Sequence, residues 1–134
     1  MHPFRAAVEA RDLEAIPALL APDAVFVSPV AFRPYQGREL VAAILVGVGR
    51  VLEDLVYVRE YATADGDGLA LLFDARVGDL QVQGCDFLRF DGEGRISELM
   101  VMLRPLSGVQ AVAERMGAQF EQIRADAQRR MASG

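Results

Sequence analysis

Residues 55–104 consist of strand-like apolar runs separated by short turn sequences, and this pattern constrains the fold more than any other feature of the chain. The predicted strands are residues 55–63, 69–77, 80–90 and 95–104. Gly78-Asp79 is typical of a two-residue hairpin turn, and glycine-rich acidic runs separate the other strands. Strands joined by such short turns pair with their neighbours in the chain. The pattern therefore predicts a four-stranded antiparallel meander.

The hairpin around Gly78-Asp79 determines which residues face each other. Val77 pairs with Leu80, and counting back along both strands places Leu71 opposite Asp86. Because side chains alternate, one face of the hairpin is apolar except for Asp86. Apolar residues on this face include Leu69, Leu71, Phe73, Ala75, Val77, Leu80, Val82, Leu88 and Phe90. A register slip of one residue would instead turn Asp86 outward.

Asp86 is the candidate catalytic residue because a carboxylate is costly among hydrocarbon side chains. Either its pKa rises or it finds hydrogen-bond donors. A neutral aspartic acid can donate a hydrogen bond inside an apolar pocket, which favours a role as an acid. The alternative is a structural role, in which a backbone amide, a water or an arginine at the rim satisfies the carboxylate.

Helical patterns flank the meander on both sides. A helix beginning at Pro3 and a short, kinked one after Asp12 precede a strand at 24–28, and a third helix begins at Arg38. One long helix is predicted from about Ser107. Its apolar stripe is Val109, Val112, Met116, Phe120 and Ile123, and it is expected to pack on the barrel or to act as a lid or a dimer contact.

This order of elements predicts an α+β fold, a cone-shaped barrel of a curved, mainly antiparallel sheet wrapped around N-terminal helices. At 134 residues the chain has the length of one domain. We expect a core at about 3–105 and a C-terminal helical extension at about 107–132.

Composition excludes several classes of function. All 14 basic residues are arginines, spread along a chain of net charge −5, so we expect no nucleic-acid partner, Schiff-base lysine or phosphate-binding loop. A single histidine, His2, argues against a metal site or a Ser-His-Asp triad, and no cofactor is expected. The single Cys85, with no apparent signal segment or membrane-spanning run, predicts a cytoplasmic protein.

Three stretches, FRAAVEARD at 4–12, AVFVSPV at 24–30 and CDFLRFDGEGRI at 85–96, resemble ketosteroid isomerases. These enzymes belong to the nuclear-transport-factor-2-like superfamily, with the SnoaL-like polyketide cyclases and limonene-epoxide hydrolases. The resemblance covers most of the first 105 residues and is most specific at 90–96. It implies a cone-shaped α+β barrel with a deep apolar pocket, usually in a homodimer.

The resemblance carries over only one of three catalytic residues. In ketosteroid isomerases an aspartate base moves a proton, while a tyrosine and a protonated aspartate stabilise the oxyanion. Asp86 matches the protonated aspartate, but Phe4 stands at the tyrosine position and Ser28 at that of the base. Ordinary steroid isomerisation is therefore not expected.

The function predicted for the chain is cofactor-independent isomerase, cyclase or hydrolase chemistry on a small hydrophobic carbonyl, enol or epoxide compound, with Asp86 as the acid. The alternative is a module of the same fold that binds a hydrophobic ligand, or only dimerises, without catalysis. Asp74 and Arg76 resemble part of an epoxide-hydrolase site but are predicted to form a surface ion pair on the face opposite Asp86.

The predicted pocket takes a small apolar ligand. Its expected lining is Phe4, Phe26, Ser28, Phe32, Tyr35, Tyr57, Phe73, Leu88, Met100 and Met102. Phe32 and Tyr35 are candidate gates at the mouth. Tyr57 and Tyr61 are predicted to share a strand face, where one of them offers a hydroxyl to the ligand, and core packing is the alternative for each. Ser28 is a polar pocket residue or a turn-former.

Overall fold

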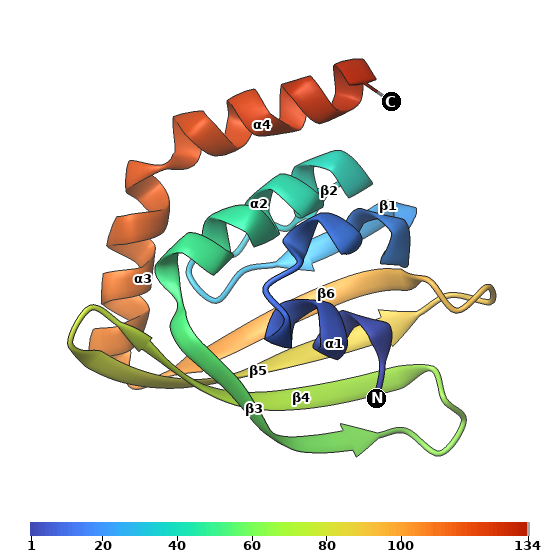
Figure 1. Cartoon of the computed structure of the whole chain (residues 1–134), viewed down its shortest axis with the longest axis horizontal. Coiled ribbons are helices and arrows are strands. Elements are labelled where there is room, and N and C mark those ends of the chain that lie inside the picture. Colours follow the sequence, from blue (N-terminus) through green and yellow to red (C-terminus); the bar gives the residue numbers. More distant parts are fainter. Residues whose placement is uncertain (134) are drawn as a thin grey trace.

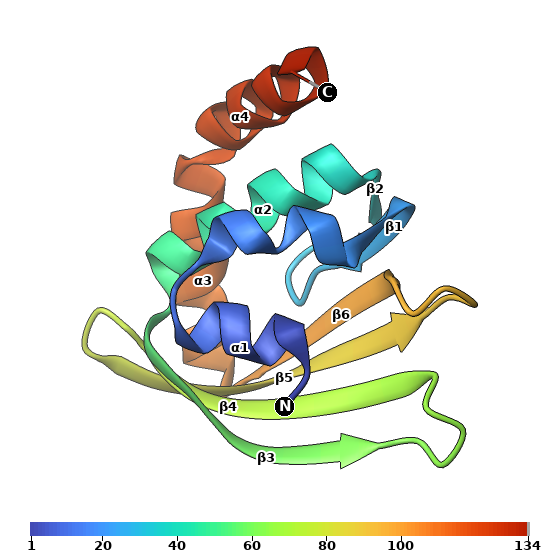
Figure 2. The same ribbon diagram turned by 45° about the vertical axis from the view of Figure 1, so that its right-hand side comes forward.

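A single curved sheet dominates the computed structural model, which describes residues 1–133 (Figure 1). Within these residues six strands lie in the order β2-β1-β6-β5-β4-β3. The strands are β1 (Leu20–Val27), β2 (Tyr35–Gln36), β3 (Glu53–Ala62), β4 (Gly68–Val77), β5 (Leu80–Phe90) and β6 (Ile96–Arg104). The sheet curves around the N-terminal helices, as Figure 2 shows from a second side, so the fold is the expected α+β cone with an unclosed sheet.

The helices lie on the concave side of the sheet. They are α1 (Pro3–Glu9), the short 3-10 turns η1 (Leu13–Ala15) and η2 (Pro17–Leu19), α2 (Arg38–Val51), α3 (Leu106–Ala118) and α4 (Phe120–Ser133). Helix α2 lies above the sheet, and α4 packs along α2 on the side away from the strands (Figure 1). No helix within residues 1–133 combines the length and apolar composition that a bilayer-spanning segment requires.

The meander is confirmed, together with the register of its hairpin. Leu71 pairs with Asp86 and Val77 with Leu80, as predicted. The strand predicted at 24–28 is β1, and it joins β6 in a parallel pair that was not predicted. The segment at 30–37, predicted to be a loop, contains the short strand β2, which adds to the free edge of β1. A hairpin can be predicted from its turn sequence, but strands about 70 residues apart have no such turn between them, so their parallel pairing could not be predicted.

The predicted long C-terminal helix is two helices that meet at Gln119. The Gln119 backbone leaves the helical region there (φ −110°, ψ 13°), and its side-chain amide donates to the carbonyl of Gly47 over 3.0 Å. Its amide oxygen accepts from Arg50 over 2.9 Å. The bend allows α3 to stand across the end of α2 while α4 runs along it, which a straight helix does not permit (Figure 1).

The amino terminus also differs from expectation. His2, expected to lie in a frayed end, caps α1: its Nδ1 accepts from the Phe4 amide over 3.0 Å, and its ring stacks on Phe90. Asp12 precedes η1 but makes no side-chain capping bond. Two 3-10 turns separated at Ile16 replace the single kinked helix, because Pro17 supplies no amide hydrogen to continue the first turn.

Gly84 in β5 allows the closest packing on the concave face. A Cβ atom at this position would lie 2.3 Å from Cζ of Phe73 and 2.7 Å from Cδ2 of Leu103. The Phe73 ring, which is 1% exposed, therefore lies directly over the Gly84 backbone. Any larger residue at 84 forces this ring out of its place.

We expect Gly84→Ala to destabilise the protein by about 1–3 kcal/mol, the usual cost of overpacking a core. Urea unfolding followed by circular dichroism measures the change. Gly92→Ala is the matched control, because a Cβ there meets no atom within 4 Å. Equal stabilities for the two variants would contradict the packing described here.

Candidate functional site

A cavity of about 260 Å³ lies between the concave face of the sheet and the helices. Most of its lining is apolar. The polar and charged side chains among the lining residues are Arg11, Ser28, Tyr35, Tyr57 and Asp86. Small-molecule pockets usually measure roughly 300–1,000 Å³, so this cavity suits a small ligand.

Asp86 lies in the cavity wall and is paired with Tyr57. The Tyr57 hydroxyl donates to Oδ2 of Asp86 over 2.6 Å. Both side chains are buried, with 7% of Asp86 and 4% of Tyr57 exposed. The structure therefore gives the stranded carboxylate a partner that sequence analysis did not name: neither a backbone amide nor an arginine, but a tyrosine from another strand.

The strand register explains how the two residues meet. Tyr57 on β3 is opposite Phe73 on β4, and Asp86 on β5 is opposite Leu71. The Tyr57 side chain therefore reaches diagonally across β4 to Asp86. The Phe73 ring lies edge-on to Tyr57, with their centroids 6.1 Å apart, and fixes the direction of that ring.

Burial controls the electrostatics of the pair. Removal of the Asp86 carboxylate from water raises its pKa from the ordinary 3.8 to about 6, and the hydrogen bond from Tyr57 opposes this rise. Burial, followed by the adjacent carboxylate charge, raises the pKa of Tyr57 as well, so the phenol keeps its proton. Asp86 can thus take up and release a proton close to neutral pH, which general acid–base catalysis requires.

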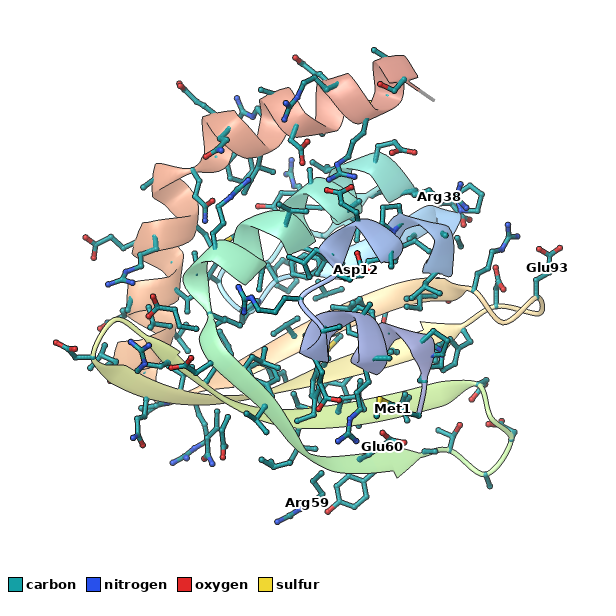
Figure 3. All side chains as sticks on the ribbon, in the orientation of Figure 1. Met1, Asp12, Arg38, Arg59, Glu60 and Glu93 are labelled. Atoms are coloured by element: carbon teal, nitrogen blue, oxygen red, sulfur yellow. The ribbon has the colours of Figure 1, made fainter. Side chains whose placement is uncertain are left out.

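A bulge in β3 corrects the prediction that Tyr57 and Tyr61 share a face. The register shifts between Tyr57, opposite Phe73, and Arg59, opposite Leu72, and this extra residue reverses the alternation. Figure 3 shows the result, with Arg59 directed away from the helices and Glu60 directed toward α1. Tyr61 therefore lies on the outer face and is 55% exposed.

Six of the ten residues predicted to line the pocket do line the cavity: Phe4, Phe26, Ser28, Tyr35, Tyr57 and Phe73. Ser28 also forms a turn, since its Oγ accepts from the amides of Val30 and Ala31 over 3.0 and 3.3 Å.

The other four predicted pocket residues lie elsewhere. Phe32 is fully exposed in the loop before β2, and neither it nor the buried Leu88 borders the cavity. Met100 and Met102 pair with Phe87 and Cys85, which places both methionines on the outer face of the sheet. The prediction that Met100 and Met102 share a face of the strand was correct. Whether that face is the one that carries Asp86 depends on the register between β5 and β6.

Asp74 and Arg76 lie outside the cavity lining, as predicted, but they do not form the expected ion pair. Arg76 binds Glu53 over 3.0 Å and Asp54 over 2.9 Å instead. Asp74 accepts a hydrogen bond from Gln83. The two side chains point the same way along β4, but the acidic partners of Arg76 come from the neighbouring strand β3.

Sequence analysis missed the part of the lining that α3 and α4 contribute. Val112, Ala113, Met116, Phe120 and Ile123 close one side of the cavity. The apolar stripe was visible, but nothing in it indicated which surface it covers. Arg11, in the link after α1, was missed as well, because no apolar pattern marks it.

A profile of the SnoaL-like domain matches residues 2–99, nearly three-quarters of the chain. The chain belongs to the SnoaL-like domain family. Helices α3 and α4 lie outside the matched residues. The comparison with functionally curated proteins found no match.

Solved structures agree with this family. A steroid Δ-isomerase from Pseudomonas aeruginosa is 46% identical over 91% of this chain and 89% of its own, with a TM-score of 0.86. An uncharacterised protein with a cystatin-like fold from Silicibacter pomeroyi is 34% identical over 89% of this chain and 86% of its own (TM-score 0.81).

A Catenulispora acidiphila protein with a ketosteroid isomerase-like fold, solved with trimethylamine, is 21% identical over 81% of this chain and 86% of its own (TM-score 0.60). At that identity the likeness concerns the fold alone. The SnoaL-like chain described here thus has the fold of the nuclear-transport-factor-2-like superfamily.

The raised pKa of Asp86 makes stability depend on pH. Below pH 3.8 the carboxyl is protonated in both the folded and the unfolded chain. Between pH 3.8 and about 6 the unfolded chain ionises first, so the folded state binds more protons and stability falls as pH rises. Above pH 6 the loss is complete, at about 3 kcal/mol.

Asp86→Asn removes this ionisation while keeping an acceptor for Tyr57. We expect the variant to gain stability relative to the unmodified protein by about 3 kcal/mol between pH 4 and pH 7.5. Denaturant unfolding at several pH values measures the difference, and Ser28→Ala, which removes no ionisable group, is the control. A difference that stays constant with pH would show that Asp86 keeps an ordinary pKa.

Proposed function

We propose that this SnoaL-like protein catalyses cofactor-independent isomerase, cyclase or hydrolase chemistry on a small hydrophobic carbonyl, enol or epoxide compound, with Asp86 as the acid. The observation that carries the proposal is the buried Asp86–Tyr57 pair in the wall of an apolar cavity. The steroid Δ-isomerase among the solved relatives, 46% identical to this chain, supports a small-molecule pocket.

The proposed chemistry is a proton transfer in a site with little water. The protonated Asp86 carboxyl donates to the oxygen of a carbonyl or epoxide as negative charge develops there. For a ketone, the carbon next to the carbonyl then loses a proton to the Asp86 carboxylate, which gives the enol isomer. For an epoxide, water adds to a ring carbon and gives up a proton to the same carboxylate, which completes the ring opening. Tyr57 holds the carboxylate by its hydrogen bond and keeps one oxygen, Oδ1, for the substrate.

A Δ-isomerase acting on a steroid is the second candidate, favoured by the 46% identity with the Pseudomonas aeruginosa enzyme. The cavity argues for a different reaction. Asp86 is the one carboxylate among its lining residues in the part of the chain that the structure describes, and Ser28 uses its oxygen in a turn. Without a second carboxylate, the proton transfer and the oxyanion stabilisation both fall to Asp86.

A non-catalytic role as a binding module remains the other reading of the same cavity. It differs from the proposal in one measurable respect, because a module binds phenols and other enolate mimics without converting the matching ketones or epoxides. The C-terminal helical extension at 107–132 has the same role in both readings. We propose that it completes the pocket, since Val112, Met116 and Phe120 line the cavity.

Activity is tested with a panel of small ketones, epoxides and a 3-oxo-Δ5-steroid, chosen after phenols that bind have been found by calorimetry. Asp86→Asn is expected to lower kcat/KM by about 100- to 1,000-fold, because the amide still donates a hydrogen bond but cannot transfer a proton. Tyr57→Phe removes the hydrogen bond that lowers the pKa of Asp86, so the midpoint of the pH–rate profile moves upward. Saturable binding without turnover across the panel would favour the module.

We also propose that the protein forms a homodimer through the outer face of its sheet. Val56 and Met102 are each 55% exposed there, and Phe87 is 38% exposed. Apolar side chains grouped on one face of a sheet and bordered by polar residues are typical of subunit interfaces. The patch lies opposite the cavity, so a partner there leaves the cavity free.

Sedimentation equilibrium tests the dimer. Met102→Glu places a charge in the middle of the outer face and is expected to raise the dimer dissociation constant at least tenfold. Met131→Glu is the matched control, because Met131 is equally exposed (57%) but lies on α4, away from the sheet. A monomeric unmodified protein, or equal dissociation constants for the two variants, would contradict this interface.

A further inference from the structure

Arg11 introduces a positive charge into the lining of a mostly apolar cavity. It is exposed, and it follows α1 at the turn whose next residue, Asp12, is labelled in Figure 3. Arg11 and Asp86 are the charged residues that line the cavity among residues 1–133, one exposed and the other buried. The cavity lining thus combines a buried acidic group with a solvent-exposed cationic group.

The backbone of Arg11 adopts a conformation that favours glycine. Its φ is +57°, and two hydrogen bonds, Arg11 N to Val8 O and Asp12 N to Ala7 O, form the Schellman motif that ends α1. Glycine is the usual residue at this position because a side chain is disfavoured in the left-handed region. An arginine here is therefore retained at a cost to stability that glycine would not incur.

The contacts of Arg11 leave most of its donors free. Within residues 1–133 its guanidinium makes one hydrogen bond, from Nη2 to the carbonyl of Gly49 over 3.0 Å, and no ion pair. Gly49 lies in the last turn of α2, so this bond satisfies one helix-end carbonyl. A guanidinium has five N–H donors, and a bidentate carboxylate needs two of them.

From these observations we infer that Arg11 binds an anionic end group of the ligand, so that the cavity takes an amphipathic carboxylate rather than a wholly apolar molecule. This inference rests on the proposed function, because it names the substrate class of the same cavity. The net charge of −5 repels anions from the protein as a whole, so recognition of an anion requires a local cation such as Arg11.

The position of the two charged residues also sets the orientation of such a ligand. An ionised Asp86 repels a second carboxylate, and the buried wall around it offers no cation. The carboxylate end therefore remains beside the solvent-exposed Arg11. The carbonyl or epoxide end, at the far end of the hydrocarbon chain, is left facing Asp86.

The experiment compares matched ligands by isothermal titration calorimetry at low salt. The probes are medium-chain keto acids with the ketone at the end opposite the carboxylate, and the methyl ester of each acid. The unmodified protein is expected to bind the best acid at least tenfold more tightly than its ester, as a charge-assisted bidentate pair implies, and to lose this preference as salt is added.

Arg11→Gly removes the cation at a position where glycine is conformationally favoured, so the variant is expected to fold. It should bind acid and ester equally, and Arg11→Lys should restore part of the preference. Arg33→Gly is the control for net charge, because Arg33 is exposed in the loop before β2 and does not line the cavity.

The outcomes separate this inference from the proposed function. Esters and phenols that bind the unmodified protein as tightly as the acids would overturn the role of Arg11 and leave the proposed function in place. An acid preference that Arg11→Gly retains would overturn it as well, since Arg11 then only caps α2. No binding of any acid, ester or phenol would overturn both.

Discussion

The hydrogen bond between Tyr57 and Asp86 makes the concave face of this protein possible. A carboxylate without a partner among leucine and phenylalanine side chains costs several kcal/mol, which is a large fraction of the stability of a small domain. One tyrosine hydroxyl, 2.6 Å from Oδ2, offsets part of that cost and occupies only one of the two carboxylate oxygens of a residue that lines the cavity. The site is therefore a compromise in which stability near neutral pH is lower than an apolar or amide side chain would give.

The sheet supplies the precision that such a pair needs. Asp86 and Tyr57 come from strands separated by β4, and each is fixed by its register with that strand. Gly84 then makes room for Phe73, whose ring lies against Tyr57. The distance between the Tyr57 hydroxyl oxygen and Oδ2 of Asp86 thus depends on three local features. They are Gly84, the bulge in β3 and the hairpin turn at Gly78-Asp79.

Local signals in the sequence predicted the parts of this arrangement that depend on short-range geometry. The turn at Gly78-Asp79 fixed the hairpin register, and with it the inward direction of Asp86. Tyr57 and Asp86 were both placed in the pocket, but their hydrogen bond was not predicted, because the irregular register of β3 on β4 leaves no mark in the residue types. Three other features were not predicted because they depend on contacts between segments far apart in the sequence. They are the parallel pairing of β1, the break at Gln119 and the side of the sheet on which Met100 and Met102 lie.

The break at Gln119 has a consequence for how proteins of this architecture can diverge. The acid group belongs to the strands, whereas one wall of the chamber around it is built from α3 and α4, after the last strand of the sheet. Substitutions in this tail can reshape the chamber without disturbing the register that positions the acid. The acid and this wall are thus encoded in separate stretches of the polypeptide, and the wall can be altered while the acid is kept.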